Sequence, residues 1–323
     1  MQLYQKRDFG TLISDTFNFF KENGKNYFKN FLLLNGLLLI AIVGLFIVGY
    51  KNFFSQIMQS NMDGTSYYYE EFFQENMSFF IIFFLLFLIV IFIAMMMTYT
   101  FPVLYLKRYA ESADKNIQLN DIIGDMKKNF GRFVLFCLGL IFIVFPLMGM
   151  VVGISFLLIF LIIGIFLLFF VVPFLSNIVS FTLYDYFNRE QGFFNSLSYA
   201  IRTQFSYSNA NAGSPFWKYW GSTAVIMFII QIITGIFSLI PAFTMTASVL
   251  TVPEADQADA MTNFFSSTMG WVYFISYGLS IMASMILSNF VYVNSGLMYY
   301  DSRLDLHKKE DLLEIDSIGQ REV

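Results

Sequence analysis

The longest uncharged stretch of the sequence runs from Phe133 to Tyr184, and it is flanked by Arg132 and Asp185. It consists mostly of Phe, Leu, Ile, Val and Gly. A helix needs roughly 20 apolar residues to cross the hydrocarbon core of a bilayer. Because this stretch is more than twice that length, it must turn back on itself. The sequence therefore predicts a transmembrane hairpin with a short connection.

Pro146, Gly149 and Gly153 lie near the centre of that stretch and are the residues expected to form the turn. Proline removes a helical hydrogen bond, and glycine adopts backbone angles that other residues avoid. We therefore expect two spans, over residues 133–150 and 154–183.

The rest of the chain is also rich in long uncharged runs. Charged residues make up 13% of the chain, whereas soluble domains carry about 25%. The predicted fold class is an all-α integral membrane protein, with one membrane domain over residues 1–304 and a cytoplasmic tail over 305–323. The six expected transmembrane helices cover residues 31–50, 78–104, 133–150, 154–183, 220–243 and 271–299.

Three segments that precede spans carry apolar residues at helical spacing, with charged residues on the other faces. They lie within residues 1–30, 107–132 and 185–218. This pattern is typical of amphipathic helices that lie in the membrane surface. Each such helix is followed by two spans, which predicts three parallel helix-plus-hairpin repeats. The alternative is that apolar segments resemble one another by composition alone.

The distribution of positive charge predicts the orientation in the membrane. Of the 19 Lys and Arg residues, all except Lys51 fall on the side of the membrane that holds the N-terminus. Positive charge concentrates on the cytoplasmic side of membrane proteins. We therefore expect both termini in the cytoplasm and a location in a bacterial cytoplasmic (inner) membrane.

Several kinds of chemistry are disfavoured by the sequence. With one cysteine, Cys137, and one histidine, His307, a disulfide within the chain is impossible and a His/Cys zinc site is effectively excluded. No phosphate-binding glycine loop, nucleophile elbow or HExxH motif occurs. The basic residues are mixed with acidic ones, unlike a nucleic-acid-binding patch. We expect no catalytic residue, no cofactor, no metal and no nucleic-acid partner.

The first candidate site is a set of uncharged polar residues within the predicted spans: Asn177, Gln231, Asn289 and Asn294. They could line a path for a solute. The alternative is that they form hydrogen bonds between helices, each worth about 0.6 to 2 kcal/mol. The central portions of the spans hold no ionisable residue, which argues against a proton-coupled transporter or a voltage sensor.

The second candidate site lies at the predicted cytoplasmic ends of the fourth and sixth spans. A polar cluster here could bind a lipid headgroup or a partner protein, and the alternative is ordinary anchoring of span ends. The residues of this set are Tyr184, Asp185, Arg189, Tyr300, Asp301 and Arg303.

The run GLMYYDSR, from Gly296 to Arg303, ends the sixth predicted span. With the six-span layout, it resembles a bacterial family of six-helix membrane domains, which precede some glycerophosphodiester phosphodiesterases or occur as uncharacterised stand-alone membrane proteins. That family commonly ends its last span in Tyr-Tyr-Asp-x-Arg, matched by Tyr299, Tyr300, Asp301 and Arg303. The resemblance implies that the enzymatic chemistry belongs to a separate soluble barrel. The sequence given ends at Val323, so we expect none of that activity here.

Three functional hypotheses follow from these patterns. The leading one is a non-enzymatic inner-membrane protein that contacts lipids or partner proteins through its cytoplasmic-side amphipathic helices. Its expected partners are membrane lipids, another membrane protein or a second copy of the chain. The alternative is a transporter or channel for an uncharged or lipid-like solute. The third is a lipid-modifying enzyme that uses Asp185 or Asp301.

Overall fold

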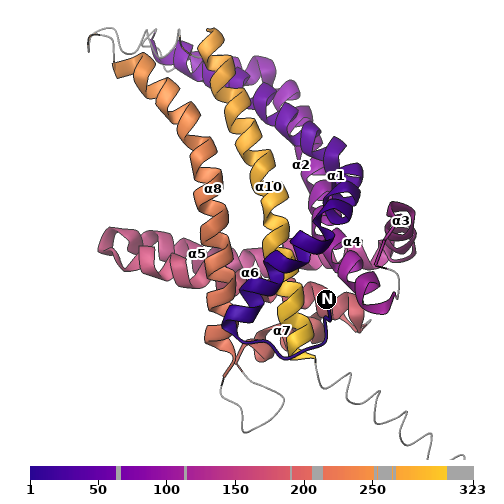
Figure 1. Cartoon of the computed structure of the whole chain (residues 1–323). Coiled ribbons are helices and arrows are strands. Elements are labelled where there is room, and N and C mark those ends of the chain that lie inside the picture. The colour runs from indigo at the N-terminus through magenta and orange to yellow at the C-terminus, as the bar shows by residue number, and fades with distance from the viewer. Residues whose placement is uncertain are drawn as a thin grey trace, which may run out of the picture. The chain divides into compact units, whose positions relative to one another are not determined.

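The structure is a computed structural model that describes residues 1–62, 67–112, 115–189, 191–205, 214–250, 253, 264 and 267–303. Throughout these ranges the regular structure is helical, and they contain no strand (Figure 1). Part of the connection between the predicted spans 220–243 and 271–299, and the whole predicted tail over 305–323, lie outside the described residues.

Six helical stretches of the described chain are long and apolar enough to cross a membrane, which confirms a multi-pass, all-α membrane protein. Two short helices, α3 (Leu119–Lys128) and α7 (Phe193–Phe205), precede spans as expected. Their position in the membrane surface, and the three-fold repeat, stay predictions. The long helices are α1 (Phe9–Met62), α2 (Tyr67–Glu111), the run from α4 (Phe130–Gly139) to α5 (Phe145–Leu157), α6 (Ile163–Asn188), α8 (Phe216–Leu250) and α10 (Thr268–Ser302).

The chain divides into two compact units. Unit 1 comprises Met1–Leu33, Met96–Phe228 and Asn289–Val323, and unit 2 comprises Leu34–Met95 and Ile229–Ser288. Helices α1, α2, α8 and α10 each have residues in both units. All candidate site residues except Gln231 belong to unit 1.

The central hairpin turns later in the sequence than we expected. Helices α4 and α5 are joined by a π-helical segment (Leu140–Val144), so the chain continues past Pro146, Gly149 and Gly153 as helix. The predicted turn at these residues, and with it the boundary between spans 133–150 and 154–183, is wrong. Pro146 lies in the first turn of α5, where its missing N–H costs little and the wider π-helical turn before it accommodates its ring.

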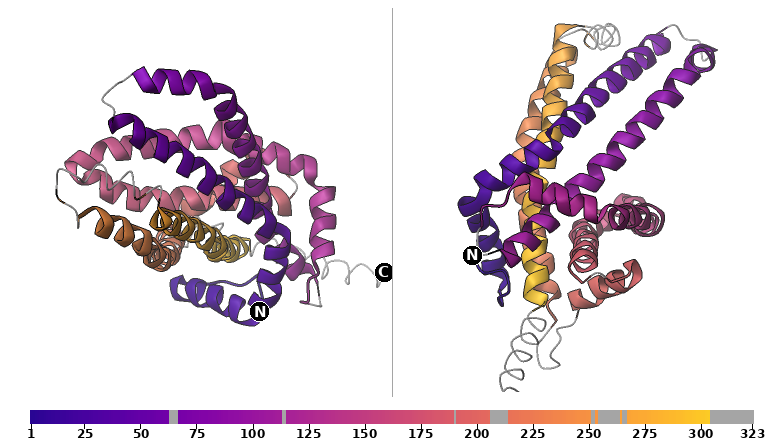
Figure 2. Two further views of the ribbon diagram at one scale, coloured as in Figure 1. Left: turned by 90° about the horizontal axis from the view of Figure 1, so that it is seen from above. Right: turned by 90° about the vertical axis from the view of Figure 1, so that its right-hand side faces the viewer.

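The chain reverses direction instead at a 3-10 turn (Leu158–Leu161) followed by Ile162, so that α5 and α6 run side by side (Figures 1 and 2). Ile162 has a positive φ of 64°, a conformation that costs a residue with a side chain roughly 1–2 kcal/mol. Gly164 follows at a close approach of backbones: a Cβ there would lie 2.2 Å from the carbonyl oxygen of Ser155. The glycine that shapes this hairpin is therefore Gly164.

Helix α1 starts at a hydrogen-bonded cap. The Oδ1 of Asp8 accepts the backbone N–H of Thr11, and the Asp8 N–H donates to the Thr11 hydroxyl, both at 2.7 Å. These bonds lower the pKa of the Asp8 carboxyl, so the cap is lost as pH falls through that lowered value. From this cap α1 continues unbroken through the first span, and the segment expected as a separate surface helix is its first half.

Aromatic side chains fill the core of unit 1. Tyr27 makes edge-to-face contacts with Phe19, Phe101 and Tyr105, at centroid separations of 5.9, 5.0 and 4.8 Å. Such pairs contribute about 0.5–1.5 kcal/mol each beyond burial of their area. In unit 2 the packing is close at Gly49 and Gly278, where a Cβ would lie 2.4 Å from Phe83 and 2.7 Å from Val43, respectively.

The hairpin geometry predicts different tolerance at three glycines. Gly164→Ala should destabilise the protein by about 2–4 kcal/mol, because the new methyl group meets fixed backbone atoms. Gly149→Ala and Gly153→Ala, which have nothing within 4 Å of the new Cβ, should be neutral or stabilising. Equilibrium unfolding in detergent measures all three. If Gly149→Ala and Gly153→Ala destabilised the protein more than Gly164→Ala, the turn would lie at residues 146–153 instead.

Candidate functional site

Asp301, near the end of α10, lies at the centre of a buried polar network within unit 1. Its Oδ1 accepts the backbone N–H of Arg7 at 2.7 Å. Its Oδ2 accepts the Lys218 Nζ at 2.5 Å and the Tyr219 hydroxyl at 2.7 Å. Because the side chain of Asp301 is 1% exposed, these protein groups take the place of water around both carboxylate oxygens.

Arg7 connects the N-terminal segment to this network through hydrogen bonds. Its guanidinium donates to Oδ2 of Asp15 at 2.9 Å and to the carbonyl oxygens of Leu3 and Gln2 at 2.7 and 2.8 Å. Lys218 donates in turn to the Arg7 carbonyl at 2.9 Å. The segment before α1 is thereby wrapped around a buried arginine and joined to both α8 and α10.

A second buried ion pair joins α6 to the end of α10. The Nη2 of Arg303 donates to Oδ1 of Asp185, and the two side chains are 6% and 0% exposed. The guanidinium lies over the ring of Tyr199 on α7, with its Cζ 3.5 Å from the centroid. The Oδ2 of Asp185 and the Nε of Arg303 have no hydrogen-bond partner. This pair links three helices and is not fully satisfied.

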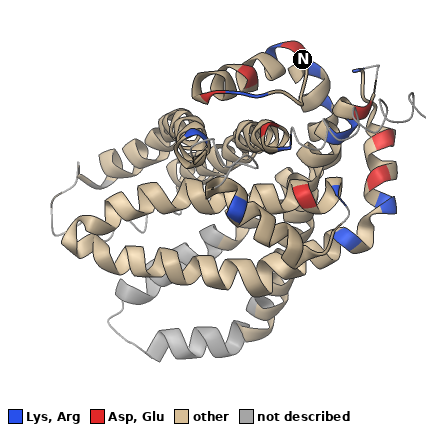
Figure 3. Ribbon diagram, turned by 90° about the horizontal axis from the view of Figure 1, so that it is seen from below, with Lys and Arg blue, Asp and Glu red and all other residues tan. Residues whose placement is uncertain are grey.

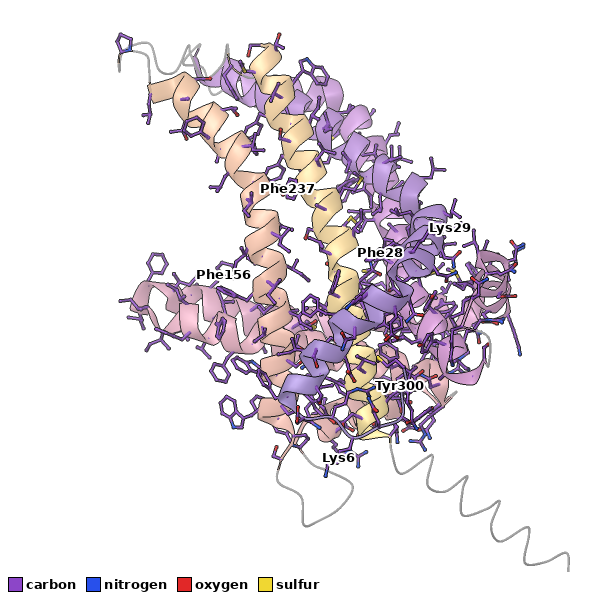
Figure 4. The ribbon with its side chains drawn as sticks, in the orientation of Figure 1. Lys6, Phe28, Lys29, Phe156, Phe237 and Tyr300 are labelled. Carbon is purple, nitrogen blue, oxygen red and sulfur yellow. The ribbon has the colours of Figure 1, made fainter. Side chains whose placement is uncertain are left out.

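The tyrosines of the GLMYYDSR run pack beside these carboxylates. Tyr299 stacks on Tyr184 at 5.7 Å between centroids, and Tyr300 meets Tyr4 edge-to-face at 4.9 Å. Figure 4 shows Tyr300 at the lower end of α10, beside the N-terminal segment. The side chains of Tyr184, Tyr299 and Tyr300 are buried, so these residues pack the helix ends together.

Gly296 explains why this run begins with glycine. A Cβ at Gly296 would lie 2.4 Å from Leu106 and 2.6 Å from the Tyr184 hydroxyl. That hydroxyl donates to the carbonyl oxygen of Tyr292 at 2.9 Å, one turn earlier on α10. The glycine therefore lets α2 and α6 approach α10 closely.

The two asparagines of α10 accept hydrogen bonds from neighbouring helices. The Oδ1 of Asn294 accepts from Ser222 Oγ at 2.8 Å and from Thr16 Oγ1 at 3.2 Å. The Oδ1 of Asn289 accepts from the Tyr27 hydroxyl at 2.8 Å. Both asparagines are fully buried.

Asn177 on α6 completes this layer. Its Oδ1 accepts the Thr223 hydroxyl at 2.7 Å, and Thr223 follows Ser222 on α8. The Nδ2 groups of Asn177 and Asn294 are buried and have no hydrogen-bond partner. Interhelical hydrogen bonding, one of the two expected roles, is therefore what the oxygens of all three asparagines do.

Two predicted site residues stay outside the network. Gln231 is an exposed residue of α8 that belongs to unit 2. Arg189 is exposed at the end of α6, where its backbone N–H donates to the Asp185 carbonyl at 3.0 Å.

Sequence reasoning missed Arg7, Lys218 and Tyr219. By sequence, Arg7 and Lys218 are two of the 18 basic residues expected on the cytoplasmic side, and nothing there distinguishes Tyr219. The one available signal is the position of Lys218 between Trp217 and Tyr219, which marks a lysine in apolar surroundings. Figure 3 shows how few segments of the ribbon carry charge, among them the N-terminal segment and α3.

The chemistry open to this network is limited by its burial. Both oxygens of Asp301 are occupied, and the uncovered oxygen of Asp185 is shielded from solvent. Within the described residues, no three His, Cys, Asp or Glu side chains come together to hold a metal ion. The contacts fit a role in holding helix ends together.

No family model, curated protein or solved structure matches this chain. The resemblance of Gly296–Arg303 to the six-helix membrane-domain family therefore stays a prediction.

Asp301→Asn tests the structural role of the network. The substitution leaves the nearly buried Lys218 ammonium without its counter-charge, and breaking a buried pair in this way costs about 3–5 kcal/mol. The matched control is Asp125→Asn, which breaks the partly exposed pair with Arg108 and should cost about 1 kcal/mol or less. Equal losses in detergent unfolding would contradict the assignment.

Proposed function

We propose that this chain is a non-enzymatic, multi-pass protein of a bacterial inner membrane that contacts lipids or a partner protein through helices on its cytoplasmic side. The observation that carries the proposal is the outward apolar face of α7. The cytoplasmic side is part of the proposal because the basic residues lie on the side of the termini, and positive charge concentrates on the cytoplasmic side of membrane proteins.

Helix α7 exposes large apolar side chains and buries small or polar ones, which is the reverse of a surface helix on a soluble protein. Three of its large apolar side chains, Phe194, Ile201 and Phe205, are 67%, 41% and 51% exposed, whereas Phe193 packs against Phe136. The side chains that it buries are small or polar, namely Ser196, Ala200, Thr203 and Gln204. A helix with its apolar face outward is stable where that face meets lipid or another protein.

The buried network fixes the direction of this face. Tyr199 lies beneath the Arg303 guanidinium, and its hydroxyl is 2.6 Å from the Ser302 hydroxyl. On the outward side, Phe205 stacks on Phe216 at 5.4 Å. The apolar surface continues at Trp217, which is 63% exposed, and tryptophan favours the headgroup layer of a bilayer.

Polar residues border this apolar face. Arg202 and Asn195 are exposed and project about 80° and 100° around the helix from Phe194, at 100° per residue. The Arg202 Nη2 donates to the Ser198 hydroxyl at 2.8 Å. This division suits a helix lying in the interface, with phenyl rings among acyl chains and a guanidinium near phosphates.

A non-enzymatic role is supported by the burial of the carboxylates. A lipid-modifying reaction at Asp301 would need an oxygen that reaches a substrate, whereas both are hydrogen-bonded inside the protein. Asp185 is likewise closed to solvent.

Transport of a small uncharged solute remains the second candidate function, because the Nδ2 donors of Asn177 and Asn294 are unpartnered inside unit 1. The leading proposal expects glycerol and urea to swell proteoliposomes no faster than empty liposomes. Swelling that is faster with the wild type and lost in Asn294→Leu would replace the leading proposal with transport.

Spin labels on α7 test the leading proposal. In a Cys137→Ala background, labels at Phe194→Cys and Ile201→Cys in nanodiscs should collide more with oxygen than with a water-soluble nickel chelate. The matched control, Asn195→Cys, should show the opposite preference. If the chelate reaches all three labels equally, α7 lies in water and the proposal fails.

A further inference from the structure

A polar pocket of about 280 Å³ lies in unit 1 between α1 and the chain that leads into α3. Figure 4 shows Lys29 beside this region. Among the residues that the structure describes, no acidic side chain lines the pocket. Its polar lining is Asn26, Lys29 and Asn30 from α1, with Asn116, Gln118 and Asn120 from the other wall.

The walls of the pocket are held together by their own hydrogen bonds. The Asn26 Nδ2 donates to the Asn116 Oδ1 at 2.9 Å, and the Asn30 Nδ2 donates to the Ile117 carbonyl at 2.9 Å. The Tyr105 hydroxyl donates to the Asn26 Oδ1 at 2.8 Å. Asn30 is 4% exposed, so the pocket has a buried polar base and is formed without a ligand.

Three side chains of the lining are not used in this framework. Among the described residues, Lys29, Gln118 and Asn120 have no side-chain partner in a hydrogen bond or ion pair. Asp121, which directly follows the lining residue Asn120 in the sequence, pairs with Arg108 at 4.0 Å. The pocket thus offers one ammonium and several carboxamides, which together donate to an anion rich in oxygen.

The location of the pocket points to the kind of anion. Lys29 immediately precedes the uncharged run of α1 that begins at Asn30, at the level where a span meets lipid headgroups. Leu33, one turn further along α1, also lines the pocket and is 62% exposed. Because a cationic side chain, Lys29, is followed along α1 by the apolar Leu33, a fitting ligand has an anionic head followed by an apolar chain.

We propose that this pocket binds the phosphate headgroup of an anionic phospholipid. Lys29 contacts the phosphate, the carboxamides of Gln118 and Asn120 bond its oxygens or headgroup hydroxyls, and Leu33 contacts the first part of an acyl chain. The volume is near the lower end of ligand pockets, roughly 300–1,000 Å³, which suits a headgroup. The proposal rests on the proposed function, since it places this end of α1 at a lipid surface.

Native mass spectrometry of the full chain in a neutral detergent tests the pocket. The added probes are phosphatidylglycerol, phosphatidylcholine of the same acyl chains, and free glycerol 1-phosphate. We expect phosphatidylglycerol to bind at least tenfold more tightly than phosphatidylcholine, and Lys29→Gln to remove most of that preference. Lys25→Gln, one turn earlier on α1, is exposed and does not line the pocket, so it should retain the preference.

Each contrary result overturns the proposal. Equal binding of the two lipids, or equal losses in Lys25→Gln and Lys29→Gln, would show that the pocket does not select an anionic headgroup. Glycerol 1-phosphate binding as tightly as phosphatidylglycerol would assign the pocket to a soluble phosphate ester. Gln118→Leu is the second variant and should weaken phosphatidylglycerol binding with unchanged unfolding. If the spin labels on α7 still lie in lipid, these contrary binding results overturn the lipid site at the pocket and leave the proposed function of the protein standing.

Discussion

The burial of two carboxylates, Asp185 and Asp301, is the constraint on which unit 1 depends. A charge in a medium of low dielectric constant is costly unless a counter-charge and hydrogen bonds replace its water. Asp301 obtains these from the segment before α1 and from the start of α8, and Asp185 obtains a counter-charge and one hydrogen bond from Arg303. Pairing the two charges therefore brings together helix ends that lie far apart in the sequence.

Many large apolar side chains, by contrast, lie on the outer surface of unit 1. Asp185, Asp301 and Arg303 are buried at the helix ends, while large apolar residues such as Phe142 and Phe160 are 73% and 93% exposed on the central hairpin. Helix α7 is anchored through Tyr199 to this interior, and its Phe194 and Phe205 are exposed. An apolar surface of this kind is stable in contact with lipid tails. The pocket lined by Lys29 presents polar groups where a lipid headgroup can bind.

The sequence predicted what depends on local composition. Uncharged runs gave the six spans, and the Tyr-Tyr-Asp-x-Arg run marked Asp301 and Arg303 as candidates. The partners of Asp301 could not be predicted, because Arg7 and Lys218 are separated from it by 294 and 83 positions and each resembles an ordinary surface cation. The turn was misplaced because Pro146 is tolerated beside a π-helical segment, and the steric need for glycine at 164 arises only from the packed hairpin.

A double-mutant cycle on Asp185 and Arg303 measures whether the buried charges hold the helices together. The free energy of unfolding would be measured in detergent for Asp185→Asn, Arg303→Met and the double variant. We expect each single variant to lose about 3–5 kcal/mol, because it leaves one buried charge unpaired. We expect the double variant to be more stable than either single variant. Additive losses, or single variants as stable as the wild type, would show that this pair does not hold the helices together.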